Sequence, residues 1–477
     1  MSQISDYEGF PIRRKRRDFA AAEVDAPWSG EVFPGEVFAD DKFAESKQDE
    51  PADAPPAIIG AEDGWNLNKA HFITFIALFL FSVVLYFRPY ELFAALSSYT
   101  SMAFYIGVAT LAVYVPSQFV AEGNLTARPR EINLILLFVV AAFLSMPLAS
   151  SPGEAYDTFT EVLLKAIVIF IVFVNAVRTE WRFKLLIWLA FAVSLYLSFF
   201  ALSDYSNGNF REGSADWNNQ RIGGAIGALF GNSNDLALHL VTMVPLAVGF
   251  GFATKNLLKR ILYLGFAVMF VAATVVTFSR GGFIGLFFTM LVLARKLGRK
   301  NKFLSAGALV VAITALLIFA PASYSSRLSS IFNTASDFTG SSTQRTEILK
   351  RSIWVTLRYP LTGVGLGNFH FKSVQELVTH NAYTQVSSEM GIAALVVYVM
   401  FMVYPLRRLR KIEEQTLEDP ERRKFHYWSI GIQASIVAYM TTSFFASVAY
   451  YWYIYYIIGY AVALRRLYYV EQVKNAQ

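Results

Sequence analysis

The sequence predicts an all-α polytopic membrane protein with about twelve transmembrane helices. Of its 477 residues, 55% are hydrophobic and only 16% are charged, whereas soluble domains carry about 25% charged residues. From residue 70 onward, long apolar runs follow one another, and a hydrocarbon core needs about 20 helical residues per crossing. The composition argues against a cytosolic globular enzyme. The aromatic content of 16% also excludes disorder over most of the chain.

Residues 1–69 differ from the rest and are predicted to form a disordered cytoplasmic tail. They hold 8 Lys/Arg and 15 Asp/Glu, several prolines and no helical apolar period, a composition typical of disorder. The basic cluster Arg13 to Arg17 lies about fifty residues before the first apolar run, so it does not fit a cleaved signal peptide. It is either a solvated charge run that keeps the N-terminus in the cytoplasm or a contact for anionic lipid.

Residues 70–320 are expected to hold nine spans and residues 385–464 three more, followed by a cytoplasmic C-terminal tail, 465–477. The candidate spans are 70–87, 92–115, 132–149, 160–177, 183–202, 234–253, 258–278, 281–294, 303–320, 385–406, 427–446 and 450–464. With the N-terminus inside, 31 of the 42 Lys/Arg lie in or beside the inner segments and 10 in the outer ones. Loops on the cytoplasmic side carry such an excess of Lys and Arg, so both termini are predicted to be cytoplasmic.

One predicted outer segment, residues 321–384, is a loop of 64 residues. Connections of this length usually have structure and a function of their own. The loop carries six basic residues, three acidic ones, and two of the five histidines, His370 and His380. We therefore expect one large structured periplasmic loop.

Within this loop, residues 342–354 have the pattern of a helix that stops before Pro360. At 100° per residue, Arg345 shares a face with Ile348 and Ser352, and Arg351 lies on another face. An arginine near a helix N-terminus can combine its guanidinium with free backbone N–H groups, which suits a phosphate. Arg345 is therefore either a phosphate ligand or a solvated loop arginine.

The segment Gly363-Val364-Gly365-Leu366-Gly367 allows tight turns or close approach of a ligand, but it is not a nucleotide-binding fingerprint. Thr379-His380-Asn381 then leads into the tenth span, and we expect His380 at the outer interface on one helical face with Tyr383, Thr384 and Ser387. Histidine accepts protons near neutral pH and is the commonest general base. His380 is either such a base or an interfacial polar residue.

Ser279-Arg280-Gly281-Gly282 stands between two apolar runs. An arginine at this position is costly in lipid and suggests function, with a headgroup held beside the glycines; the alternative is an arginine that snorkels to the interface. His239 lies inside the sixth span and is expected to be hydrogen-bonded within the bundle. The chain has no cysteine and no sequence motif of a metal site.

These motifs together resemble the O-antigen ligase and O-antigen polymerase superfamily of bacterial inner-membrane proteins. The resemblance covers roughly residues 75–465 and leaves the N-terminal tail unexplained. Its motifs are Arg88-Pro89-Tyr90-Glu91, Gly231-Asn232-Ser233-Asn234-Asp235, Ser279-Arg280-Gly281-Gly282, Arg345, Pro360-Leu361-Thr362-Gly363-Val364-Gly365, His380-Asn381-Ala382-Tyr383 and Glu389-Met390-Gly391.

The resemblance implies a GT-C-like glycosyltransferase bundle that works at the periplasmic face without a metal or other cofactor. By position, His380 matches the catalytic histidine, Arg280 and Arg345 match arginines that hold the donor diphosphate, and Arg221 is a weaker match. We further expect Arg351, Tyr383 and His370 as acceptor or loop contacts.

The partners that the resemblance implies are an undecaprenyl-diphosphate-linked glycan as donor, and lipid A-core or a growing polysaccharide as acceptor. We expect membrane lipid around the bundle and no nucleic acid. The N-terminal tail is a candidate binding segment for cytoplasmic or assembly partners. Ligase and polymerase remain alternatives because both use this donor and these motifs. A transporter or lipid-linked glycan flippase is the alternative from another class, although its ionisable residues would be expected near mid-membrane; a non-catalytic scaffold is a third.

Overall fold

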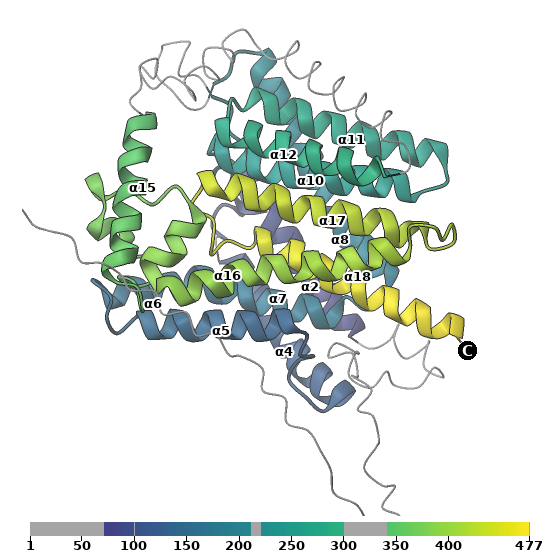
Figure 1. Ribbon diagram of the computed structural model, residues 1–477, viewed down its shortest axis with the longest axis horizontal. Helices are drawn as coiled ribbons and strands as arrows, with labels where there is room; N and C mark the ends of the chain where they lie inside the picture. Colours follow the sequence, from purple (N-terminus) through teal and green to yellow (C-terminus); the bar gives the residue numbers. More distant parts are fainter. Residues whose placement is uncertain (1–70, 100, 211–220, 300–340, 477) are drawn as a thin grey trace, which may run out of the picture. The chain divides into compact units, whose positions relative to one another are not determined.

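The computed structural model describes residues 71–99, 101–210, 221–299 and 341–476, and these form helices and turns without a β-strand. The all-α class is therefore confirmed (Figure 1). The helices that overlap predicted spans are α2 (Phe72–Phe87), α4 (Met102–Glu122), α5 (Arg130–Ser145), α7 (Leu164–Ala176), α8 (Glu180–Ser206), α10 (Ser233–Ala253), α11 (Leu257–Val276), α12 (Arg280–Leu297), α16 (Ala382–Gln415), α17 (Arg423–Thr442) and α18 (Tyr453–Ala476).

Every predicted span except 303–320 thus overlaps a helix, although α4 begins ten residues after the start of the predicted span 92–115. Span 303–320 lies outside the described residues, as does the N-terminal tail. By length and composition, seven helical segments of the described chain can cross a membrane. They are Phe72–Leu92, Met102–Glu122, Pro152–Ala176, Glu180–Ser206, Ser233–Ala253, Leu257–Val276 and Ala382–Gln415. The chain is a multi-pass membrane protein, and the total of about twelve spans stays a prediction.

Shorter helices connect these elements. They are α3 (Pro89–Leu92), η2 (Ala94–Leu96), α6 (Pro152–Thr158), the π-helix η3 (Phe159–Leu163), α9 (Gly227–Phe230), η6 (Phe369–Lys372), η7 (Val374–Glu376) and η8 (Ser443–Phe445). The remaining long helix, α15 (Ser341–Arg358), belongs to the predicted outer loop. It stands across the direction of α10, α12, α16 and α17 at one end of them (Figure 1).

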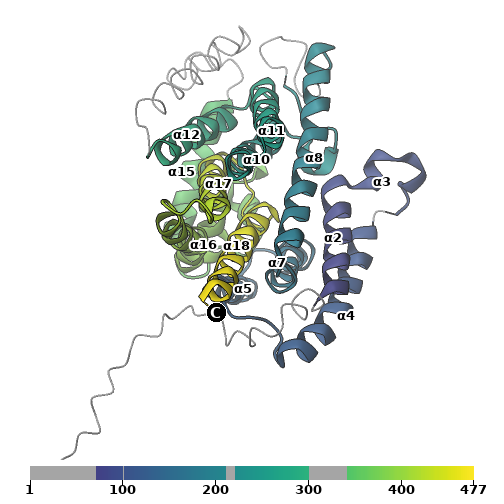
Figure 2. The same ribbon diagram turned by 90° about the vertical axis from the view of Figure 1, so that its right-hand side faces the viewer.

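Helix α17 lies inside the bundle. It contacts α10, α12, α16 and α18, and Figure 2 shows it between these helices when they are viewed nearly along their axes. Most of its side chains are buried. A helix surrounded in this way needs no polar face, which is why the apolar run of α17 has little amphipathic pattern.

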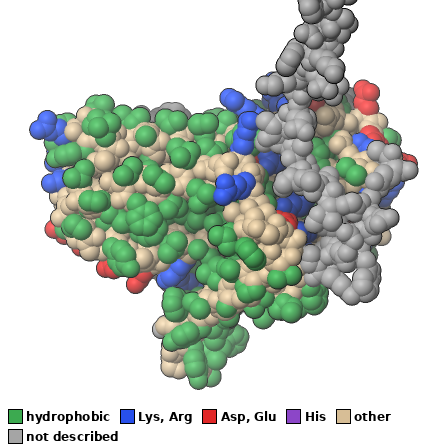
Figure 3. Space-filling model, turned by 90° about the horizontal axis from the view of Figure 1, so that it is seen from below, with side chains coloured by type: hydrophobic (Ala, Val, Ile, Leu, Met, Phe, Trp, Pro, Cys, Tyr) green, Lys and Arg blue, Asp and Glu red, His purple; other side chains and the backbone are tan. Residues whose placement is uncertain are grey.

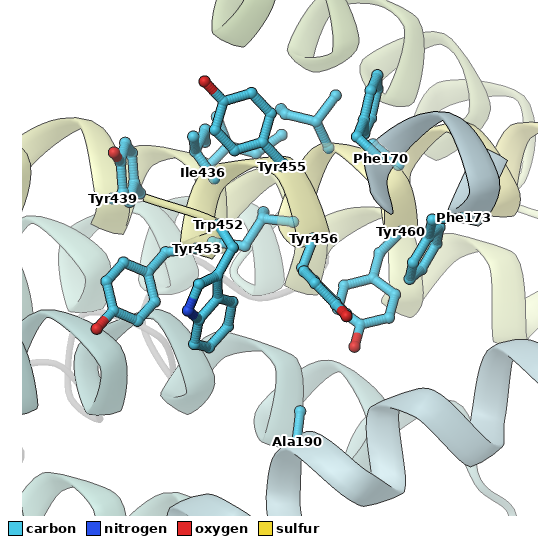
Figure 4. Close-up of a cluster of buried hydrophobic side chains, with 14 of the residues drawn as sticks. Phe170, Phe173, Ala190, Ile436, Tyr439, Trp452, Tyr453, Tyr455, Tyr456 and Tyr460 are labelled. Carbon is cyan, nitrogen blue, oxygen red and sulfur yellow. The ribbon is translucent and has the colours of Figure 1, made fainter. Parts of the chain in front are cut away.

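Aromatic side chains of α18 and the turn before it fill the space between α17 and α7 (Figure 4), and Tyr456 also packs against Tyr86 of α2. Buried phenol groups need hydrogen-bond partners, and these tyrosines have them. The Tyr456 hydroxyl lies 2.7 Å from Ser82 Oγ, and the Tyr460 hydroxyl donates to the Leu186 carbonyl at 3.2 Å. His239 Nε2 lies 3.0 Å from Ser194 Oγ on α8, so its prediction as a hydrogen-bonded bundle residue is confirmed.

Three arginines close the C-terminal end of α7. Arg178 Nε donates to the Asn175 carbonyl at 2.6 Å, Arg182 Nη1 to the Ala176 carbonyl at 2.9 Å, and Arg466 Nη1 to the Val174 carbonyl at 2.9 Å. The last carbonyls of a helix lack intrahelical partners and form the negative end of its dipole. The guanidinium groups satisfy both requirements at the end that the charge pattern predicts to be cytoplasmic.

Large apolar side chains remain exposed over the outside of the bundle. Examples on α11 are Leu258, Ile261 and Val268, and α4 exposes Val120. Figure 3 shows hydrophobic side chains spread over much of one such face. A soluble protein rarely exposes apolar surface on this scale, so this surface agrees with a lipid surrounding.

Candidate functional site

Arg280, His380 and Arg345 lie at the end of the bundle where α12 and α16 begin. The chain's C-terminus lies at the opposite end of these helices (Figure 1). Helix η8 and the segment after it join the parts of this end. Phe445, the last residue of η8, contacts the start of α12, and Ser447 contacts the residues before α16.

Arg280 is the first residue of α12. Ser279 caps that helix by accepting a hydrogen bond from Gly282 N at 3.1 Å, and its hydroxyl donates to Asn234 Oδ1 on α10 at 2.8 Å. Gly281 lies so close to Phe445 that a Cβ would stand 2.7 Å from the Phe445 Cβ. This contact fixes the half-buried Arg280 at a helix N-terminus, where guanidinium and dipole both favour an anion.

His380 lies directly before α16. Its backbone N–H donates to Ser447 Oγ at 2.8 Å, and its φ of 51° is in the left-handed region. Asn381 caps the helix, accepting from Tyr383 N at 2.9 Å and Thr384 N at 3.0 Å. The expectation that His380 shares a helical face with Tyr383, Thr384 and Ser387 is therefore wrong, because the helix starts only at Ala382.

Burial lowers the pKa of the His380 imidazole, and the nearby positive charge of Arg345 lowers it further. Both effects disfavour the charged form of histidine. The ring is accordingly neutral at pH 7 and has a nitrogen lone pair that can accept a proton. The effect of Arg345 on the pKa of His380 indicates that the fold places the two residues near each other, although they are far apart in the sequence.

Arg345 is carried by α15, which the sequence pattern predicted correctly. This helix has a small core of its own. Ile348 and Val355 pack with Val364 and Phe369 of the following loop. Thr356 Oγ1 lies 2.9 Å from Ser387 Oγ on α16. The described part of the predicted outer loop is thus folded, and it holds Arg345 half-buried beside the start of α16.

Arg221 stands at the start of a compact segment that precedes α10. Within it, Gly224 N donates to the Phe230 carbonyl at 2.5 Å, and Tyr453 of α18 donates to the Leu229 carbonyl at 3.2 Å. The segment therefore packs on the first turn of α18. Arg221 is half-buried in this setting.

The three further candidate residues make contacts within the protein. Arg351 Nε donates to the Lys372 carbonyl at 2.6 Å, and Tyr383 donates to the Met440 carbonyl at 2.7 Å. His370 Nε2 lies 3.3 Å from a carboxylate oxygen of Glu154 on α6, and its Nδ1 lies 3.0 Å from the Gly367 carbonyl. These contacts hold the loop in place, and a direct role with substrate stays a prediction.

The role of Glu389 was missed from the sequence. Its side chain on α16 is 4% exposed, and its Oε2 accepts from Gly367 N at 2.8 Å and from the Tyr450 hydroxyl at 2.7 Å. Two further bonds join the same places, from Val364 N to the Ser388 carbonyl and from Gly365 N to the Glu389 carbonyl. The only sequence signal was a carboxylate inside an apolar span two residues before Gly391.

Gly391 breaks α16 and makes room for this loop. Its φ is 89°, and a Cβ there would stand 2.3 Å from the Leu361 carbonyl oxygen. The N–H of Ile392 donates to the Pro360 carbonyl at 2.8 Å. Residues 360–367 therefore pair with backbone groups around the break, and irregular backbone inside a span needs such partners.

In the described ranges, no three His, Cys, Asp or Glu side chains are grouped in a way that could hold a metal ion. Asp235 lies in the first turn of α10, and the predicted site residues at this end are arginines and one neutral histidine. Such a set can bind an anion and accept a proton.

Comparison with known families identifies part of the chain. Residues 264–399 match the family model Wzy_C, described as O-antigen ligase. The match runs from α11 into α16 and includes Arg280, Arg345, His380 and Glu389, but not Arg221. No curated protein matches the chain. The family match confirms the resemblance to the O-antigen ligase superfamily.

Proposed function

From the match of residues 264–399 to the O-antigen ligase family model, we propose that the protein transfers a glycan from undecaprenyl diphosphate to an acceptor hydroxyl at the periplasmic face of the inner membrane. Members of the family are glycosyltransferase-like ligases and polymerases. The observation that carries the proposal is the neutral His380 held beside Arg345, at the same end of the bundle as Arg280 on its helix N-terminus.

In the proposed reaction, a nitrogen of His380 takes the proton of the acceptor hydroxyl as its oxygen attacks the anomeric carbon. A new carbon–oxygen bond forms on one face of the sugar while the bond to the diphosphate breaks on the other, so the anomeric configuration inverts. The bonding electrons stay with the diphosphate, which leaves as undecaprenyl diphosphate. A positioned base of this kind typically contributes about 10²–10⁴-fold in rate.

Arg280 and Arg345 are proposed to bind the diphosphate, with Arg221 as a third contact. Negative charge grows on the leaving group in the transition state, and fixed positive groups in a site shielded from water stabilise it. Arginine suits this task because its planar fork matches two phosphate oxygens at once. The reaction then needs neither a metal nor another cofactor.

The test uses purified protein in proteoliposomes with an undecaprenyl-diphosphate glycan and an acceptor. We expect His380→Ala to abolish transfer while its elution profile and thermal unfolding match those of the wild type. Val378→Ala is the control, because Val378 is an exposed apolar side chain in the same loop, two residues before His380. Full activity of His380→Ala would remove His380 as the base.

A ligase and a polymerase differ in what accumulates when the protein is missing. Deleting the gene should leave short lipid-linked repeat units if the protein polymerises them. It should leave long undecaprenyl-linked polymers if the protein ligates finished chains to lipid A-core or another acceptor.

A further inference from the structure

Helix α15 carries an exposed apolar surface that its own small core does not use. Ile348, Ser352 and Val355 face inward, whereas Ile353, Trp354 and Leu357 lie on the other side of the helix and are exposed. Leu361, three residues beyond the helix end, is the most exposed of these apolar residues at 83%, and Leu357 is 71% exposed. We call Ile353, Trp354, Leu357 and Leu361 the α15 stripe.

The stripe has a polarity gradient along the helix. At 100° per residue, Lys350 and Thr346 lie on the same side as Leu357 but toward the N-terminal end, and both are exposed. The exposed side therefore changes from polar to apolar as the chain approaches Pro360. A helix inserted obliquely at a membrane interface has this pattern, with its polar end in water and its apolar end among acyl chains.

Backbone contacts set the depth of the apolar end. Ile392 N donates to the Pro360 carbonyl at 2.8 Å, and Gly391 lies against the Leu361 carbonyl. Gly391 and Ile392 fall inside the predicted span 385–406. From there α16 exposes Ile392, Val396 and Met400 at intervals of four residues, which places them on one face. The α15 stripe thus ends at the height where the apolar face of α16 begins.

Charged and aromatic residues near the stripe fit the same position. Lys350 and Arg358 are exposed, and the Arg351 guanidinium carbon lies 4.4 Å from the centre of the Trp354 ring. Tryptophan is enriched at membrane interfaces, and basic side chains reach toward lipid phosphates from an apolar stem. The orientation of α15 across the bundle helices (Figure 1) also suits a helix near the membrane plane.

We propose that α15 is an interfacial membrane helix whose stripe inserts into the outer leaflet, with Lys350 and Arg358 at the level of lipid phosphates. The partner of this surface is the lipid bilayer itself. The consequence is positional. Helix α15, which carries Arg345, then lies at the level of the lipid headgroups, and the phosphate groups of any lipid in that leaflet lie at the same level. This inference concerns membrane contact and does not depend on glycosyl transfer.

The absence of cysteine from the chain permits a clean test. Single variants Leu357→Cys and Leu361→Cys are labelled with a polarity-sensitive fluorophore and reconstituted as full-length protein in phosphatidylglycerol-containing vesicles. Val396→Cys on the exposed face of α16 is the lipid-facing control, and Glu347→Cys on the polar half of α15 is the aqueous control. Quenching is measured with lipids that carry a nitroxide on the acyl chain and with aqueous iodide.

We expect labels at 357 and 361 to emit at short wavelength and to be quenched by the nitroxide lipids, as at 396. The label at 347 should instead be quenched by iodide. Quenching of 357 and 361 by iodide alone would overturn the proposal. Protection of both positions from lipid and iodide would also overturn it, because a protein surface, such as a second copy, would then cover the stripe.

Discussion

His380 is a histidine whose surroundings keep it uncharged. Burial and the positive charge of Arg345 both lower its pKa, so the neutral form persists to a lower pH than that of an ordinary histidine with a pKa of about 6.5. If the neutral ring is the base, transfer fails only when the ring becomes protonated, as the pH falls through this lowered pKa. The acid limb of the pH–rate profile is therefore expected below pH 6.5.

Replacing Arg345 gives a prediction with a definite sign. In Arg345→Gln one of the two causes that lower the pKa of His380 is gone, so the pKa rises and the acid limb moves to higher pH. The measurement is the pH dependence of kcat/KM in proteoliposomes, which reports the pKa of the protein without substrate, using the residual activity of the variant. Arg358→Gln serves as the control, since Arg358 does not contribute to the pKa shift of His380. An acid limb that stays at the same pH would show that Arg345 does not influence the group that accepts the proton.

Arg280→Lys tests whether the shape of the guanidinium matters or only its charge. Lysine keeps the positive charge but loses the two-pronged donor fork. We expect kcat to fall by at least about tenfold, which corresponds to the loss of about 1.4 kcal/mol of transition-state stabilisation. Equal rates of initial transfer for variant and wild type would make Arg280 an interface anchor.

For single residues, candidates for the site were easier to select from the sequence than their local conformation and contacts were to predict. Arg280 was selected as a candidate because an arginine between two apolar runs is conspicuous, and Arg345 and His380 because they match the family's motifs; the roles of all three stay predictions. The shared helical face of His380 was predicted wrongly, because periodicity alone does not show that Asn381 caps the helix. Glu389 was left without a role because its partners, Gly367 and Tyr450, are 22 and 61 residues away in the sequence.

Among the elements, α16 and the loop that packs on it depend on each other. Glu389 accepts hydrogen bonds from Gly367 and Tyr450, and loop and helix also pair through their backbones. The loop in turn packs on α15 through Val364 and Phe369. Glu389 therefore helps to hold the helix that carries Arg345, without needing to touch substrate.

Glu389→Ala should destabilise this arrangement more than Glu389→Gln. Alanine leaves the Gly367 N–H and the Tyr450 hydroxyl buried without their acceptor, at a cost of about 1–3 kcal/mol for each group. Glutamine keeps an acceptor oxygen. The measurement is thermal unfolding in detergent, with Tyr450→Phe as the control that removes only one of the two donors. Identical midpoints for the alanine and glutamine variants would contradict the role of the carboxylate oxygen.

The sequence predicted the helices well because long apolar runs are a strong signal. It did not predict that α16 is broken at Gly391, since a single glycine in an apolar run is a weak signal and the partner of the break is the loop around Pro360. The π-helical turn at Phe159–Leu163 was likewise not predicted. Both features depend on packing between segments, which local periodicity does not contain.

For the whole molecule, the charge pattern predicts one orientation in the membrane. The excess of Lys and Arg on one side predicts that both termini are cytoplasmic and that residues 321–384 are periplasmic. A fluorescent protein that matures only in the cytoplasm should be bright when fused after Gln477. Alkaline phosphatase, which needs the periplasm, should be active when fused after Val378. The opposite pair of results would show that the protein has the inverse orientation, with the candidate site on the cytoplasmic side.

The arginines at the end of α7 connect the way this chain enters the membrane with the way it packs. Arg178, Arg182 and Arg466 contribute to the charge bias that is expected to orient the chain during insertion, and in the folded bundle they donate to the last carbonyls of a buried helix. One set of side chains thus acts first in biogenesis and later as permanent structure. A neutral replacement at any of the three is expected to lower the yield of correctly inserted protein. It is also expected to lower the stability of the folded bundle in the molecules that insert.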